Sequence, residues 1–274
     1  MKFDTIEDRM LYLRSMSDYK LIPNTYVMVM LDGKNFSKKI KKKFKKPFDE
    51  KFISLMNATA EYVCSVVQGA RLAYVQSDEI SILLSDFDTP NTDGFFGYRL
   101  CKMQSIIASE ATSFFNREIV KMSLKDATTV SEMLEIINKE PLYQFDCKCW
   151  NLCNYNDVFS WFLYRQNDCI KNSKSQAAQT YLSAKTLLNR HTDEQIELLK
   201  EIHGIDWYDY SDSEKYGRLV YKIIVQATRE VKPGEIVTYD RTKWSAIPAP
   251  VLSTDEGREK FEDIEVIKFY KNKT

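Results

Sequence analysis

The order of periodic segments in the first 152 residues constrains the fold more than any other feature of this sequence. Apolar, β-rich runs predict strands over 25–32, 71–77, 79–85 and 144–152. Apolar residues spaced by three and four predict helices over 48–67 and 98–118. This order of strand, helix, strand, strand, helix, strand is that of a split βαβ, or ferredoxin-like, unit. We therefore predict an α+β fold in which both helices cover one face of a four-stranded antiparallel sheet.

The rest of the chain is expected to add helices and a hairpin to this unit. Helical patterns extend over 4–18, over 156–188 as two helices, and over 192–204, while 121–141 is irregular or helical. Two strands over 217–230 and 235–247 predict a hairpin, and a last short strand is expected at 266–270. These C-terminal elements are expected to pack on the first unit and not to form a free domain.

Composition excludes several classes of protein. The chain has 39 basic and 39 acidic side chains, so a nucleic-acid partner would need a local basic patch. The N-terminal MKFDTIEDRM is too charged for a signal peptide, and no apolar run approaches the roughly 18 residues of a membrane span. We expect a cytoplasmic protein with no membrane partner and with reduced cysteines.

Three of the six cysteines lie close together in the sequence, at Cys147, Cys149 and Cys153. A metal site is one interpretation, but the only histidines are His191 and His203, and the spacing fits no common zinc pattern. The alternation in FDCKCWNL favours a strand whose Cys147 and Cys149 side chains point inward.

Two carboxylates follow strands that should be neighbours in the sheet. Asp32 closes the first strand, and Asp78 and Glu79 lie in the hairpin after the adjacent strand. Because adjacent strands are about 4.8 Å apart, Asp32 and Asp78 can meet at one sheet edge. Two such carboxylates repel each other, and a divalent cation with oxygen ligands, such as Mg²⁺, removes the repulsion. Alternatively, Asp32-Gly33 is a simple turn, and Ser77-Asp78-Glu79 is a turn or a helix cap.

The residues after Asp32 favour phosphate binding. Gly33 frees the backbone, and the amides of the following Lys34, Asn35, Phe36 and Ser37 can form an anion-binding concavity. A lysine cluster then follows, which consists of Lys38, Lys39, Lys41, Lys42, Lys43, Lys45 and Lys46. It is either a basic patch or a solvated loop, although interleaved aromatic residues argue against a fully flexible run. Arg99 and Lys102 share a helix face, where they either clamp a triphosphate or are surface charges.

Five stretches together resemble the tRNA-His guanylyltransferase family, which adds nucleotides in the 3′-to-5′ direction. They are LDGKNFSKK at 31–39, KKPFDEKFISLMNATA at 45–60, AYVQSDEISILL at 73–84, GYRLCKMQSIIAS at 97–109, and FDCKCWNL with WFLYRQNDCIKNS at 145–173. The resemblance implies a polymerase-type palm, two Mg²⁺ ions, ATP and GTP as activating and substrate nucleotides, tRNA as partner and a homotetramer. It also implies a palm-type catalytic region over 1–153 and a helical and β-hairpin region over 154–274 that contacts tRNA or other subunits.

The resemblance also assigns roles to individual residues. It implies that Asp32, Asp78 and the Gly33 carbonyl bind metal, and that Glu79 is an acidic neighbour needed for activity. Nucleotide binding is implied for Lys34, Asn35, Phe36, Ser37 and Ser77 at the phosphates, for Lys46 and Asp49 near the activating nucleotide, and for Arg99 and Lys102 at the triphosphate. On the helical region, Lys171, Asn172, Lys174, Lys185 and Arg190 are candidate tRNA contacts.

One departure from the family pattern concerns specificity. Eukaryotic members carry a His-Ile-Asn-Asn stretch where this sequence has Ile170-Lys171-Asn172-Ser173. The sequence therefore resembles the guanylyltransferase-like branch, which repairs 5′-truncated tRNAs by template-directed addition. Two alternatives stay open: another palm-domain enzyme such as a nucleotidyl cyclase, and a non-catalytic tRNA-binding protein that uses the lysine cluster.

Overall fold

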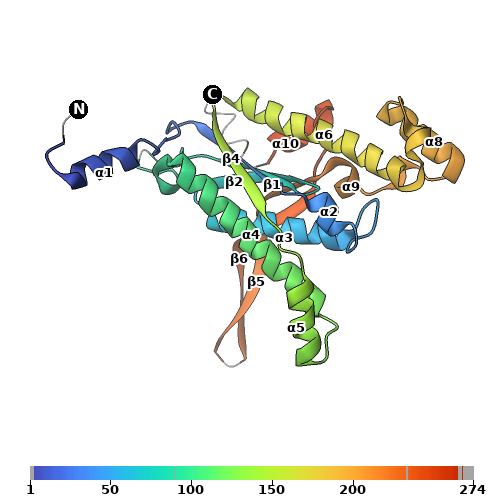
Figure 1. The fold of residues 1–274 in the computed structure, drawn as a ribbon, viewed down its shortest axis with the longest axis horizontal. Coiled ribbons are helices and arrows are strands. Elements are labelled where there is room, and N and C mark those ends of the chain that lie inside the picture. Colours follow the sequence, from blue (N-terminus) through green and yellow to red (C-terminus); the bar gives the residue numbers. More distant parts are fainter. Residues whose placement is uncertain (1–2, 90, 233, 265–266, 268–274) are drawn as a thin grey trace.

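A six-stranded antiparallel sheet forms the centre of the computed structural model, which describes residues 3–89, 91–232, 234–264 and 267 (Figure 1). Its strands lie in the order β4-β1-β3-β2-β5-β6. Their bounds are β1 Tyr26–Gly33, β2 Ala70–Gln76, β3 Glu79–Leu84, β4 Phe145–Leu152, β5 Arg218–Lys232 and β6 Glu235–Pro248. The first four strands have the order expected of a split βαβ unit, and the predicted α+β fold is confirmed. The predicted C-terminal hairpin extends the sheet at β2.

Both faces of the sheet are covered by helices. Helices α3 (Glu50–Val66) and α4 (Leu100–Leu124) pack on the face that carries Val27, Val29 and Leu31, as expected. Helix α3 begins at Asp49, whose side chain accepts hydrogen bonds from the amides of Lys51 and Phe52. The opposite face, which carries Met28 and Leu83, packs against α6 (Tyr155–Tyr181) and α10 (Asp255–Glu262).

Several shorter helices surround this framework. They are α1 (Ile6–Ser15), α2 (Phe36–Ile40), α5 (Val130–Lys139), α7 (Ala184–Leu187), α8 (Thr192–His203) and α9 (Asp212–Tyr216), with single 3-10 turns at Phe95–Tyr98 and Trp207–Asp209. The buried Trp207 and Leu199 join α8 to the C-terminal half of α6 in a separate apolar cluster. Gly204, with a φ of 67°, ends α8 as the sequence predicts.

The other helix predictions differ from the structure in detail. The two helices predicted over 156–188 are present, as the 27-residue α6 and the four-residue α7. The polar stretch in the middle of α6 is compatible with a helix, because Cys169, Ser173 and Ala177 keep a spacing of four on the buried side. The predicted N-terminal helix forms, but its apolar residues are exposed. The strand expected at 266–270 lies outside the described residues, except for Ile267.

Cys64, Cys149 and Cys169 are buried in the apolar clusters, whereas Cys101 and Cys153 are exposed. All six cysteines are free, and the Sγ atoms of Cys147 and Cys149 lie 3.8 Å apart on the face that α4 covers. The inward orientation predicted for these two side chains is therefore confirmed. Among the residues described, no helix combines the length and the apolar character that a bilayer span requires.

Candidate active site

Asp32 and Asp78 meet at one edge of the sheet. Asp32, near the end of β1, stands opposite Glu79 of β3 and Asp146 of β4. The Gly33 amide donates a hydrogen bond to the Asp78 carbonyl at 3.1 Å, which fixes the β2–β3 turn against the end of β1. The turn itself is tight because Ser77 adopts a left-handed φ of 44°, and its hydroxyl donates to the Asp78 carboxylate at 3.0 Å.

The structure leaves no room for a side chain at Gly33. A Cβ at this position would lie 2.7 Å from the Asp78 Oδ2 atom and 2.6 Å from the Phe36 ring. Phe36 cannot give way easily, because its ring is buried and packs against those of Phe115 and Phe145 at centroid distances of 5.1 and 4.9 Å. The absence of a Cβ therefore leaves the Asp78 carboxylate close to the Gly33 backbone.

Electrostatics at this edge favour a cation. Burial raises the pKa of Asp32, and the nearby Asp146 carboxylate raises it further. Burial likewise raises the pKa of Asp78, and Asp32 adds to that effect. A bound cation would relieve this repulsion, and carboxylate and carbonyl oxygens are the ligands that Mg²⁺ prefers. Within the described ranges, no three His, Cys, Asp or Glu side chains form a closed metal cluster, so the Gly33 carbonyl, water or phosphate would complete the shell.

Glu79 occupies a different environment from the two aspartates. Its buried carboxylate accepts hydrogen bonds from Nε and Nη2 of Arg165 on α6, with 2.7 Å between Nε and Oε1. Arg165 also contacts Asp168 at 3.0 Å. Burial raises the pKa of Glu79, and Arg165 opposes this shift. Glu79 is therefore held by α6 on the same face of the sheet as its cross-strand partner Asp32, whereas Asp32 is exposed and Asp78 is half-buried.

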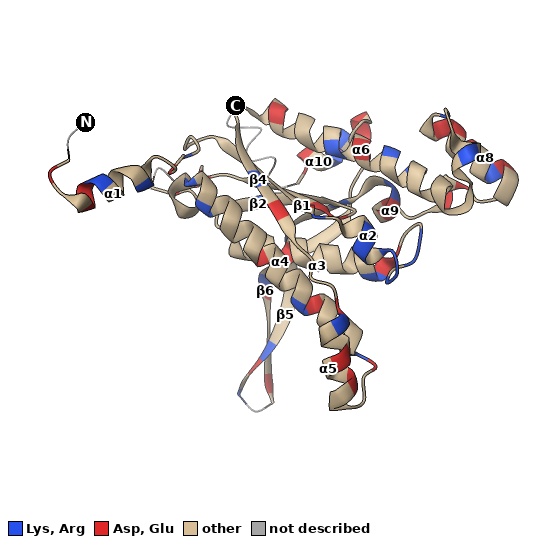
Figure 2. Cartoon of the chain, in the orientation of Figure 1, with Lys and Arg blue, Asp and Glu red and all other residues tan. Residues whose placement is uncertain are grey.

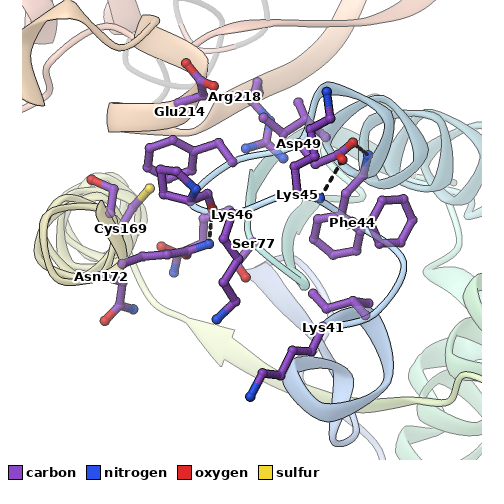
Figure 3. A pocket seen from close by; sticks show the side chains of 18 residues that line it. Lys41, Phe44, Lys45, Lys46, Asp49, Ser77, Cys169, Asn172, Glu214 and Arg218 are labelled. Atoms are coloured by element: carbon purple, nitrogen blue, oxygen red, sulfur yellow. Dashed lines mark hydrogen bonds between the residues drawn. The ribbon is translucent and has the colours of Figure 1, made fainter. Parts of the chain in front are cut away.

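A pocket opens beside Asp78 (Figure 3). It holds about 780 Å³ of empty space between the segment that follows α2, the β2–β3 turn, α6 and the start of β5. The residues that matter for binding are the apolar Phe44, Phe48 and Phe52, and the cationic Lys41, Lys45, Lys46 and Arg218. Ser77 also lines the pocket. Because Ser77 directly precedes Asp78, the pocket lies next to the end of the sheet at which Asp32 and Asp78 meet. Apolar walls with a few polar groups are typical of small-molecule sites.

The structure brings some of the predicted nucleotide-binding residues to this pocket. Lys46, Asp49 and Ser77 line it, and Figure 2 shows the lysines of α2 and the following loop gathered on the side of the molecule below α6. The Asp49 carboxylate accepts hydrogen bonds from the backbone amides of Lys45, Lys51 and Phe52. Its main role is therefore to fix the backbone at the start of α3. Lys34, Asn35 and Ser37 are exposed just beyond Gly33, and Asn35 begins α2 with a left-handed φ of 58°.

Arg99 and Lys102 are not brought to this edge. Arg99 pairs with Lys20 in a short bridge and with the Asp18 carboxylate at 2.8 Å, and Lys102 lies over the Phe96 ring. These residues lie near the end of β3 that is remote from the Asp78 turn, and β3 is about 17 Å long. Their contact with a triphosphate stays a prediction.

The residues of the helical region that are predicted to contact tRNA fall into two groups, those that are exposed and those that have partners within the chain. Lys171, Lys185 and Arg190 are exposed. Lys174 forms an ion pair with Asp193 and lies 5.0 Å from the centre of the Trp207 ring, while Asn172 donates to Asp168 at 3.1 Å. Their roles at tRNA stay predictions.

Two residues of the site were not predicted from the sequence. Asp146 lies opposite Asp32 because of the register between β1 and β4, and Arg165 contacts Glu79 because α6 packs against β3. Neither the register nor the packing can be deduced from local sequence patterns. The one sequence signal for Arg165 is a charged residue within the apolar stripe of a helix.

The sequence is similar to those of several known proteins. A family model described as tRNAHis guanylyltransferase matches residues 10–153. The chain is 34% identical over 219 residues to the tRNA(His) guanylyltransferase of Eremothecium gossypii, covering 73% of this chain and 84% of that protein. It is 28% identical over 249 residues to an uncharacterized protein of Acanthamoeba polyphaga mimivirus, covering 86% and 82%.

Solved structures give the same picture. A bacterial tRNA(His) guanylyltransferase-like protein in complex with ATP superposes with a TM-score of 0.75 at 30% identity, covering 94% of this chain and 98% of that one. The tRNA(His) guanylyltransferase of Saccharomyces cerevisiae superposes with a TM-score of 0.62 at 25% identity, covering 77% and 91%.

Proposed function

The chain belongs to the tRNA(His) guanylyltransferase family, and on this premise we propose that it adds nucleotides in the 3′-to-5′ direction to the 5′ end of tRNA. The observation that carries this proposal is the meeting of Asp32 and Asp78 beside a pocket with aromatic walls and lysines. Relatives in complex with ATP and with GTP support a nucleoside triphosphate as ligand.

We assign the residues as follows. Asp32, Asp78 and the Gly33 carbonyl would hold Mg²⁺, with two ions proposed by analogy with the family. Bound Mg²⁺ neutralises phosphate charge and lowers the pKa of an attacking hydroxyl. The lysines of the pocket attract the triphosphate, and its apolar walls exclude water from the base. Glu79, held by Arg165, keeps the end of β3 in register with Asp32.

The reaction needs an electrophilic 5′ end on the tRNA. A 5′-monophosphate end is first activated by ATP or GTP, whereas a 5′-triphosphate end needs no activation. The 3′-hydroxyl of an incoming nucleoside triphosphate then attacks the 5′ α-phosphorus of that end and loses its proton. A phosphodiester bond forms, and the bond to the leaving group breaks, which releases AMP or GMP from an activated end and pyrophosphate from a 5′-triphosphate end. Most of the catalysis in such phosphoryl transfers comes from positioning and charge neutralisation. Mg²⁺ held by Asp32 and Asp78, together with the lysines of the pocket, would provide both.

Repair of 5′-truncated tRNAs is the activity we favour over strict action on histidine tRNA. The segment Ile170-Lys171-Asn172-Ser173 lies in α6, where Ser173 is buried and its hydroxyl accepts a hydrogen bond from the Trp207 indole. Ile170 and Ser173 therefore pack against α8 and the Trp207 turn, which leaves only Lys171 and Asn172 of this segment to contact tRNA. Pairing with the opposite tRNA strand would then select the added nucleotide.

The test is an addition assay with 5′-triphosphorylated, 5′-truncated tRNA, a labelled nucleoside triphosphate and Mg²⁺. We expect a tRNA lengthened at its 5′ end by the nucleotide complementary to the opposite strand. Asp32→Asn and Asp78→Asn should abolish the product, whereas the exposed control Asp126→Asn should retain it. A cyclic nucleotide product would indicate a cyclase instead, and tRNA binding without turnover would indicate a binding protein.

A further inference from the structure

Arg218 is a buried cation with an unused donor. The residue begins β5, is only 4% exposed, and lines the pocket. Its Nε donates to Asn57 Oδ1 at 2.9 Å and its Nη1 donates to the Ser213 carbonyl at 3.3 Å. The Nη2 group is buried and has no hydrogen-bond partner in the described part of the chain, and none of the described carboxylates forms an ion pair with this guanidinium. Burying a charged donor without a partner is unfavourable, so this group points to a ligand.

The position of Arg218 indicates which part of a nucleotide would reach it. Arg218 pairs with Val75 of β2, so it lies three strands from Asp32 in the order β1-β3-β2-β5. Three strand spacings are about 14 Å. If the phosphates lie at Asp32 and Asp78, the group near Arg218 is at the opposite end of the nucleotide, which is the base. Figure 3 shows Arg218 on the side of the pocket that faces Lys41 across Ser77.

We propose that Arg218 donates a hydrogen bond to the base of the activating nucleotide, the one assigned to Lys46 and Asp49, and that the pocket therefore prefers guanine to adenine in that nucleotide. This inference rests on the proposed function, in which tRNA pairing selects the added nucleotide. A guanidinium can only donate. Guanine presents two acceptors, O6 and N7, along one edge, whereas adenine replaces O6 with an amino donor. Asn57 and Ser213 hold the guanidinium in place, so little conformational freedom is lost when the base binds.

The first test compares ligands on the wild-type protein without tRNA. Dissociation constants are measured with Mg²⁺ for GTP, inosine triphosphate, 7-deaza-GTP and ATP. We expect GTP and inosine triphosphate, which share O6 and N7, to bind about ten- to a hundred-fold more tightly than ATP, the effect of one hydrogen bond from a charged donor. Equal affinity for GTP and ATP would overturn this inference alone, whereas failure of every nucleotide to bind would overturn the proposed function as well.

The second test removes the donor. Arg218→Met should bring the affinity for GTP down to that for ATP and leave the affinity for inorganic tripolyphosphate within about twofold. An equal loss of tripolyphosphate binding would mean that Arg218 contacts phosphate, and it would overturn the inference. Lys222→Met, which removes an exposed cation from the same strand, is the matched control and should change neither affinity. Asn57→Ala keeps the charge but frees the guanidinium, so it should weaken the guanine preference even if Arg218→Met does not fold.

Discussion

Arg165 donates two hydrogen bonds to Glu79, and Glu79 stands directly opposite Asp32 in the pairing of β1 with β3. Both side chains of the ion pair are only 10% exposed. One contact therefore joins α6 on one face of the sheet to the strand that carries the carboxylate edge. Loss of either partner would leave the other charge buried and would disturb the position of Asp32.

Arg165→Met should destabilise the protein by about 3 kcal/mol, because it leaves the buried Glu79 carboxylate without its partner. The melting temperature should fall by roughly 5–10 °C. The control is Lys260→Met, which breaks an exposed ion pair with Glu256 and should leave the melting temperature unchanged. Equal melting temperatures for wild type and Arg165→Met would show that the buried pair does not stabilise this face.

Gly33→Ala should abolish nucleotide addition. The added methyl group would meet the Phe36 ring and the Asp78 carboxylate, so the carboxylate must move away from the β1 end. A destabilisation of about 1–3 kcal/mol should accompany this change. Gly204→Asn, at the open end of α8, serves as control, since Asn tolerates a left-handed φ and no atom lies near its Cβ. Full activity of Gly33→Ala would contradict the close approach at the site.

The contribution of Asp32 and Asp78 to the stability of the metal-free protein should decrease as pH rises through the acidic range. Because the fold raises the pKa of Asp32 and Asp78, their contribution is fully present below the ordinary carboxyl pKa of about 4 and is lost as pH rises through the raised values. The increase in melting temperature caused by Mg²⁺ should therefore grow with pH. Asp78→Asn should flatten this dependence and raise the melting temperature of the metal-free protein, while Asp126→Asn should do neither. A Mg²⁺ effect that does not vary with pH would argue against the site.

Arg99→Met tests whether the far end of the sheet also contacts nucleotide. The family resemblance implies a triphosphate contact, but Arg99 pairs with Asp18 near the end of β3 that is remote from the Asp78 turn. We expect this variant to raise the KM for nucleotide more than it weakens tRNA binding, and to leave metal affinity unchanged. An unchanged KM, or an equal loss of nucleotide and tRNA affinity, would remove Arg99 from the nucleotide-binding residues.

The sequence predicts the core of this fold because local periodicity and topology agree. The strand, helix, strand, strand, helix, strand order leads to the sheet order β4-β1-β3-β2, and that order places Asp32 beside the Asp78 turn. The same topology separates Arg99 from the Asp78 turn. Since β3 begins at the Asp78 turn, it must end at the opposite edge of the sheet, and α4 starts from there.

Other features depend on long-range contacts that periodicity does not contain. Asp146 faces Asp32 only because of the β1–β4 register, and a shift of one residue would put it on the other face. The sequence does not distinguish Arg218 from any other strand residue. Its two neutral hydrogen-bond partners and its unpaired Nη2 group are visible only in the structure. The apolar spacing in the N-terminal segment predicts α1 but not what it packs against, because a helix pattern carries no information about its partner.

The most direct test of the central claim is Mn²⁺ binding in the presence of GTP, measured by electron paramagnetic resonance on wild type, Asp32→Asn, Asp78→Asn and Asp126→Asn. The account predicts that wild type and Asp126→Asn bind Mn²⁺ equally well, and that each of the other two variants weakens binding at least tenfold. Mn²⁺ affinity in Asp32→Asn and Asp78→Asn equal to that of wild type would contradict a metal site at this edge of the sheet.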